Sequence, residues 1–264
     1  MKAGASALPA ANPEAPATLV DATKVVLWGL VFWGGERLAA SVFERNATAM
    51  AAAQAAIAEW GASRMGIAWS DRRGASSWPA IGHRVAVGAG LGLVCAMAVV
   101  GTSLVARAAV VVPGEASLGV LIVGLFVASL GAVRDELLLR GVVVRATRLL
   151  PVGATLAACG LAAAAARFGS EGKINMALVL EALRGVAFGA LWIRDRGAWM
   201  ACAANAVWTW TMGPVVGGGL LDVRFAAAQS AGASSYVAYV VLAVAAAGAS
   251  FYAMRAPSTP GQGT

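Results

Sequence analysis

Residues 117–141 read SLGVLIVGLFVASLGAVRDELLLRG, an apolar run that ends in a group of charged side chains. A helix needs about 20 apolar residues, at about 1.5 Å per residue, to cross about 30 Å of hydrocarbon. The apolar part therefore predicts a membrane-spanning helix near residues 117–133. Because this segment is short for a span, either the bilayer is thinner around it or the helix extends past the charged residues used here as its limits.

The composition extends this conclusion to the rest of the chain. Of the 264 residues, 59% are hydrophobic and 12% are charged, whereas soluble domains carry about 25% charged residues. The net charge of +7 is spread along the chain, which favours basic loops of a membrane protein over a nucleic-acid-binding surface. A disordered chain and a coiled coil are also excluded. Three cysteines lie in apolar runs without metal-ligand spacing, which predicts packing residues: Cys95, Cys159 and Cys202.

Six apolar segments predict an all-α, polytopic integral membrane helix bundle. They lie near residues 85–106, 117–133, 151–166, 176–193, 198–217 and 235–254. We expect residues 84–254 to form this bundle, between disordered tails at 1–24 and 255–264.

An N-terminal region and loop, residues 25–83, precede the bundle. Phe43, Met50 and Ile57 recur every seven residues, which predicts an amphipathic helix over 20–62 on the membrane surface. The alternative is a true span at 25–42.

The distribution of Lys and Arg predicts the orientation. Most of them precede the first span or fall between spans two and three or four and five, whereas the opposite loops hold Arg107, Arg167, Lys173 and Arg224. Since cytoplasmic loops are rich in Lys and Arg, both termini are expected in the cytoplasm.

Two polar groups stand out at helical spacing. Glu136 and Arg140 lie four residues apart, so the arginine can hold that carboxylate, while Asp135 points about 100° away. The alternative is a charged helix end anchored at the interface. Asn205 and Thr209 share the same spacing and form either a helix–helix contact or part of a site.

Two further groups lie in or beside apolar segments. Arg167 follows an alanine run and is either an outer-leaflet anchor or a site residue. Glu181 and Arg184 predict an ion pair inside a span.

The order of these groups resembles the CPBP family (CAAX protease and bacteriocin-processing, or Abi) of intramembrane glutamic proteases. Asp135-Glu136-x-x-x-Arg140-Gly141 resembles the family's Glu-Glu-x-x-x-Arg-Gly. Ala163-x-x-x-Arg167 stands where the family has Phe-x-x-x-His, and Asn205-x-x-x-Thr209 where it has His-x-x-x-Asn. The similarity covers about residues 118–213. The single histidine, His83, fills neither position.

The resemblance implies hydrolysis of a peptide bond by a carboxylate-activated water, without a metal or other cofactor. The implied site residues are Asp135, Glu136, Arg140, Arg167, Asn205 and Thr209. The implied partners are the lipid bilayer and a membrane-anchored protein or peptide substrate, processed at a C-terminal tail or sorting signal in the bacterial cytoplasmic membrane. A guanidinium does not deprotonate in proteins, so Arg167 cannot take the proton-transfer role of a histidine.

Two other functions follow from the same residues. A catalytically inactive relative would be a membrane scaffold, an immunity factor or a partner protein that kept the bundle. A transporter is the third hypothesis, prompted by the Glu181–Arg184 pair and the glycine-rich stretch at 213–219.

Overall fold

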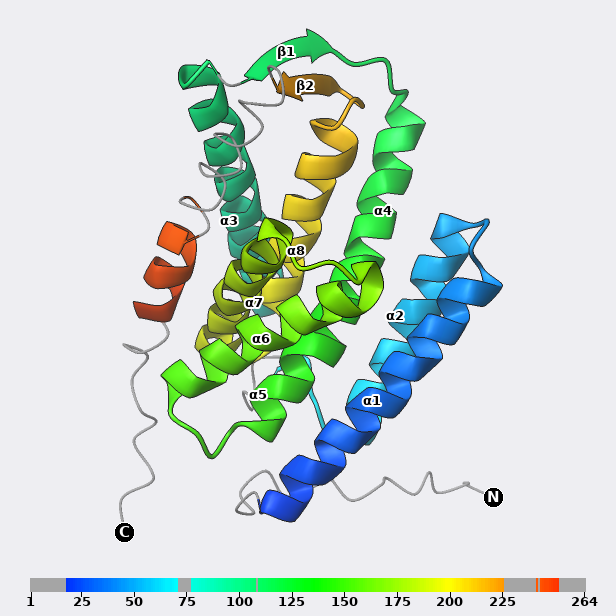
Figure 1. The fold of residues 1–264 in the computed structure, drawn as a ribbon, viewed down its shortest axis with the longest axis vertical. Coiled ribbons are helices and arrows are strands. Elements are labelled where there is room, and N and C mark those ends of the chain that lie inside the picture. Colours follow the sequence, from blue (N-terminus) through cyan, green and yellow to red (C-terminus); the bar gives the residue numbers. More distant parts are fainter. Residues whose placement is uncertain (1–17, 71–76, 108, 226–240, 242, 252–264) are drawn as a thin grey trace.

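The computed structural model describes residues 18–70, 77–107, 109–225, 241 and 243–251, and most of these residues are helical (Figure 1). The described elements follow in the order α1 (Leu19–Val42), α2 (Ala47–Arg64), α3 (Trp78–Val105), β1 (Ala109–Pro113), α4 (Leu118–Arg134), the π-helical segment η1 (Asp135–Gly141), α5 (Val142–Ala146), α6 (Val152–Glu171), α7 (Met176–Asp195), α8 (Trp199–Trp210), the π-helical segment η2 (Thr211–Val215) and β2 (Leu221–Phe225). The predicted helical membrane bundle is confirmed.

Five helices within the described ranges are long and apolar enough to cross a bilayer. They are Leu19–Val42, Trp78–Val105, Leu118–Ala146, Val152–Glu171 and Met176–Asp195. The predicted span at 198–217 is the shorter α8 with η2, which contacts α3, α4 and α7. Of the predicted span at 235–254, residue 241 and residues 243–251 are described, and they are helical.

The N-terminal region is a helical hairpin rather than one amphipathic helix over 20–62. Helix α1 begins at Leu19, inside the predicted tail, because Thr18 and Asp21 form a reciprocal cap. The chain turns at residues 43–46, and α2 packs back against α1, where the Phe32 and Trp60 rings meet edge to face at 5.2 Å. The structure thus favours the alternative of a span in this region, and the predicted tail at 255–264 lies outside the described residues.

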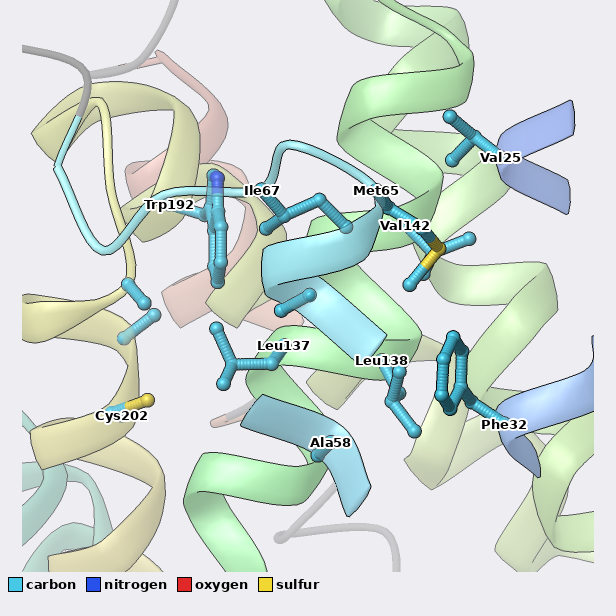
Figure 2. Packing of buried hydrophobic residues seen from close by; sticks show 13 residues of the cluster. Val25, Phe32, Ala58, Met65, Ile67, Leu137, Leu138, Val142, Trp192 and Cys202 are labelled. Carbon is cyan, nitrogen blue, oxygen red and sulfur yellow. The ribbon is translucent and has the colours of Figure 1, made fainter. Parts of the chain in front are cut away.

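Helix α4 continues without a break through η1 into α5. The acidic motif therefore lies inside a long helix. The sequence had placed it at the end of a span, and this placement is wrong. The apolar side of η1 fixes this segment, since Leu137 and Leu138 are buried in one cluster with Phe32, Trp192 and Cys202 (Figure 2). Its other side carries the charged residues of the motif, Asp135, Glu136 and Arg140.

Helices α3 and α8 approach each other closely because glycines stand at their contact. A Cβ atom added at Gly88 would collide with the carbonyl of Met200, and one added at Gly92 with the carbonyl of Ala204. Small residues of this kind let helix backbones pack tightly in a membrane. The contact fixes the position of Asn205, the next residue of α8.

Replacing Gly92 by leucine is expected to lower the free energy of unfolding by about 1–3 kcal/mol, because α8 must move away from α3. The matched control is Gly90→Leu on the same helix, where an added Cβ meets open space. Unfolding in micelles, followed by titration with a denaturing detergent, measures both. Equal stabilities for the two variants would contradict the close packing.

Two connections close the ends of the bundle. At one end β1 and β2 pair antiparallel, with Ala109 opposite Phe225 (Figure 1). At the other end Ala198 N–H donates to the carbonyl of Trp69 at 3.0 Å, and the Arg84 Nε lies 3.2 Å from Asp195 Oδ1. These contacts hold the start of α3 against the turn between α7 and α8.

Candidate functional site

A carboxylate, a guanidinium and an amide meet in the interior of the bundle. Glu136 Oε1 accepts a hydrogen bond from Arg140 Nη1 at 3.1 Å and one from Asn205 Nδ2 at 2.9 Å. Glu136 and Asn205 are fully buried, and Arg140 is 1% exposed. Thr209 Oγ1 donates to Asn205 Oδ1 at 3.4 Å, which orients the amide. The acid of η1 and the amide of α8 are therefore one hydrogen-bonded group.

Asp135 faces a different direction and is held by two other arginines. Its Oδ1 accepts from Arg134 Nε at 2.8 Å and from Arg134 Nη2 at 2.6 Å. Its Oδ2 accepts from Arg184 Nη2 at 3.3 Å. The two motif carboxylates thus have separate arginine partners, since neighbouring helix residues point in different directions.

The ion pairs continue across the neighbouring helices. Arg184 Nη1 also donates to Glu181 Oε1 at 3.2 Å, which confirms the predicted pair. Arg167 Nη1 lies 3.9 Å from the same Glu181 oxygen, and its Nη2 lies 2.5 Å from Glu171 Oε1. Asp135 is therefore connected through Arg184 and Glu181 to Arg167.

A polar cavity of about 260 Å³ lies between α1, α2, η1, α6 and α7. Its charged and polar lining comprises Glu36, Arg37, Gln54, Arg134, Asp135, Arg140, Arg167, Ser170, Glu181 and Arg184. Glu136 and Asn205 do not line it; they lie behind Arg140, which does. A polar hollow of this kind among membrane helices is typical of a functional site.

Within this cavity four groups have unused hydrogen-bonding capacity. The Nε atoms of Arg140, Arg167 and Arg184 are buried without a partner among the described residues, and so is Oε1 of Glu36. Buried polar atoms are normally paired, and exceptions often mark the place of a ligand or a water molecule. The cavity can therefore offer three donors to a negatively charged or carbonyl oxygen.

The structure brings the six predicted site residues together in two separate networks, which start at the neighbouring residues Asp135 and Glu136. Asp135, Arg140 and Arg167 reach the cavity, whereas Glu136, Asn205 and Thr209 support Arg140 from behind. The alternative of a charged helix end at the interface is wrong for this motif, because Glu136 and Arg140 are buried. His83 is exposed on α3 and is not among the residues that line the cavity.

Sequence reasoning did not assign several polar residues of the cavity to the site, and Glu36 and Gln54 are two of them. Gln54 Oε1 accepts from Arg134 Nη1 at 3.0 Å, and Gln54 Nε2 donates to the carbonyl of Glu36 at 3.3 Å. The sequence did contain a signal for Glu36, because a charged residue inside an apolar membrane helix is costly unless it faces the interior of the bundle. Assigning 20–62 to the membrane surface concealed that signal.

The described ranges contain no group of three or more His, Cys, Asp or Glu side chains placed to hold a metal ion. The fold and the site together define an integral membrane helix bundle with a buried carboxylate–arginine–amide centre beside a polar cavity. Comparisons with protein families, curated proteins and solved structures find no match to this chain.

Proposed function

We propose that this protein is a divergent CPBP-type intramembrane endopeptidase, which hydrolyses a peptide bond in a membrane-associated protein or peptide. The observation that carries the proposal is the position of Asp135, the motif carboxylate that lines a polar cavity together with Arg167. The residues that resemble the family's motifs come from η1, α6 and α8, and their side chains form two networks, one that joins Asp135 to Arg167 through Arg184 and Glu181 and one that joins Glu136 to Asn205.

In this proposal Asp135 activates water. Arg134 and Arg184 hold it as a carboxylate, so it can accept a proton from a water molecule that attacks the scissile carbonyl. Arg140 and Arg167 supply donors to the oxyanion that forms, a contribution of several kcal/mol in other enzymes, about 3–4 kcal/mol for one donor. Glu136, Asn205 and Thr209 are positioning residues, because they hold Arg140.

The substrate is a membrane-anchored protein or peptide, cut in a C-terminal tail or sorting signal in the bacterial cytoplasmic membrane.

We propose that both termini lie in the cytoplasm. The α1–α2 hairpin returns the chain to the side from which it started, so it leaves the orientation of α3 unchanged. The end that carries the 65–70 segment and the α7–α8 turn is rich in arginine: Arg64, Arg84, Arg145, Arg148, Arg194 and Arg196.

Asp135→Asn is expected to abolish the proposed cleavage, because an amide cannot accept the proton of water. The measurement labels new protein N-termini in membranes of a bacterial host that expresses either chain, and follows their appearance with time. Termini made by the wild type should fall at least about 100-fold in the variant. Asp222→Asn, on β2 and not among the residues that line the cavity, is the matched control and should leave them unchanged. Identical sets of termini for the wild type and Asp135→Asn would refute the proposal.

A catalytically inactive scaffold or immunity partner is the second candidate. It is favoured by the arginine contacts of both motif carboxylates, since ion pairs at 2.6 Å (Asp135) and 3.1 Å (Glu136) can be purely structural. In that case Asp135→Asn would change the stability of the bundle and leave the N-termini of the membrane fraction as they are.

A further inference from the structure

Within the described part of the chain, Glu36 is the carboxyl group of the cavity that has no cationic partner. It lies on α1, is 7% exposed and lines the same cavity as Asp135. Its Oε1 is buried without a hydrogen bond. Among the described residues no Lys, Arg or His nitrogen lies within 4.0 Å of its carboxyl oxygens, whereas Asp135, Glu136 and Glu181 each have an arginine at that distance.

The surroundings of Glu36 favour a protonated side chain. The charged groups that share the cavity with it are Arg37 of α1, Arg134, Asp135 and Arg140 of α4 and η1, Arg167 of α6, and Glu181 and Arg184 of α7. Most of these arginines already contact another carboxylate. A buried carboxylate without a paired cation is costly, and protonation removes that cost.

Gln54 joins Glu36 to the Asp135 group. Its amide links the backbone carbonyl of Glu36 to the side chain of Arg134, which in turn binds Asp135. The contacts between α1, α2 and η1 therefore hold the two carboxyl groups on the wall of one small cavity. A pair of carboxyls, one ionised and one protonated, is the arrangement by which aspartic proteases cleave peptides.

We propose that Glu36 is the proton donor of the site and completes a two-carboxyl catalytic pair with Asp135. This inference rests on the proposed function and supplies the proton transfer that the missing histidines leave open. Glu136 lies outside the cavity, and Glu181 is held by arginines. Among the described residues that line the cavity, Glu36 is therefore the acid free to give up a proton.

The reaction balances with these two groups. The Asp135 carboxylate takes one proton from water, and the water oxygen bonds to the scissile carbonyl carbon, whose oxygen becomes an anion. Glu36 then gives its proton to the amide nitrogen, the C–N bond breaks and the carbonyl re-forms. The products are a carboxylic acid and an amine. A proton passes from Asp135 to Glu36 through water, and the starting state returns.

The test replaces Glu36 by glutamine and by aspartate, with Glu44→Gln as the matched control. Glu44 is an exposed carboxylate in the α1–α2 turn. We expect Glu36→Gln to slow the appearance of the wild-type N-termini by about 100-fold or more, Glu36→Asp to restore part of the rate, and Glu44→Gln to have no effect.

Infrared spectra of the purified protein provide a second readout, which is independent of cleavage. The wild type and Glu44→Gln should show the C=O stretching band of a protonated carboxylic acid at neutral pH, shifted in heavy water, and Glu36→Gln should lack it. The pH dependence of cleavage should also lose its alkaline limb in Glu36→Gln.

The possible outcomes separate the two proposals. Full activity in Glu36→Gln, or the absence of a Glu36-dependent infrared band, overturns the role of Glu36 as proton donor. In that case, loss of cleavage in Asp135→Asn would still support the proposed endopeptidase function. A wild type that makes no new termini overturns both. A lower rate in Glu36→Gln with an unchanged pH profile shows a structural role and also overturns the proposal.

Discussion

Replacing Arg140 by methionine should lower the free energy of unfolding by about 3–5 kcal/mol, the largest stability effect we expect from a single substitution in this protein. The substitution leaves a buried carboxylate without a cation, which is costly. Glu136 is fully buried, and Arg140 is its cationic partner at 3.1 Å. Without that arginine the carboxylate keeps only the Asn205 amide, and the Phe188 ring loses the guanidinium 5.6 Å from its centre.

Two further variants make this prediction specific. Arg224→Met breaks the Asp222–Arg224 pair, in which the arginine side chain is 69% exposed, and should cost less than about 1 kcal/mol. The double variant Glu136→Gln with Arg140→Met removes the stranded charge and should recover most of the loss. Titration with a denaturing detergent in micelles measures all three. Similar losses for Arg140→Met and Arg224→Met would contradict a buried pair.

The largest gain of activity is expected from the double substitution Arg167→His with Asn205→His. Arg167 lines the cavity beside Asp135 but cannot exchange a proton, whereas an imidazole both donates and accepts one near neutral pH. A histidine at position 205 keeps an N–H donor toward Glu136. General acid–base catalysis contributes about 10²–10⁴-fold, so cleavage should rise by about 100-fold.

The rate at which new N-termini appear in host membranes measures this gain. Adding Asp135→Asn to the double variant should return cleavage to the level of Asp135→Asn alone, because the imidazole at position 167 acts on a water that Asp135 activates. If the double variant folds and its cleavage rate does not rise, the result would support the catalytically inactive scaffold. A gain that survives Asp135→Asn would assign the base to another residue.

The membrane fold was predictable because apolar runs long enough to span a bilayer are rare in other proteins. The helix ends were less predictable. The predicted span at 117–133 stopped at Arg134, yet the helix runs to Ala146, since the buried partners of the charged residues replace water. The hairpin of α1 and α2 was also missed, because the Asn46 cap at its turn is a local signal within a continuous seven-residue pattern.

Part of the site was predictable from local spacing. The Glu136–Arg140 and Glu181–Arg184 pairs follow from neighbouring turns of one helix. The contact between Glu136 and Asn205 depends on the packing of α8 against α4, and spacing alone does not specify it. Glu36 could not be placed at all, because its position depends on how the hairpin docks against η1.

The wide turns of η1 restrict how this protein can change during evolution. A π-helical segment accommodates one residue more than an α-helix over the same stretch. Deleting one residue near Leu138 would close these turns to α-helical geometry and leave the helix after them in place, whereas inserting one there would rotate everything after it by about 100°. The insertion would set Arg140 five residues from Glu136 and take Val142 out of its apolar cluster. Descendants of this protein should therefore tolerate the loss of a residue in this segment better than the gain of one.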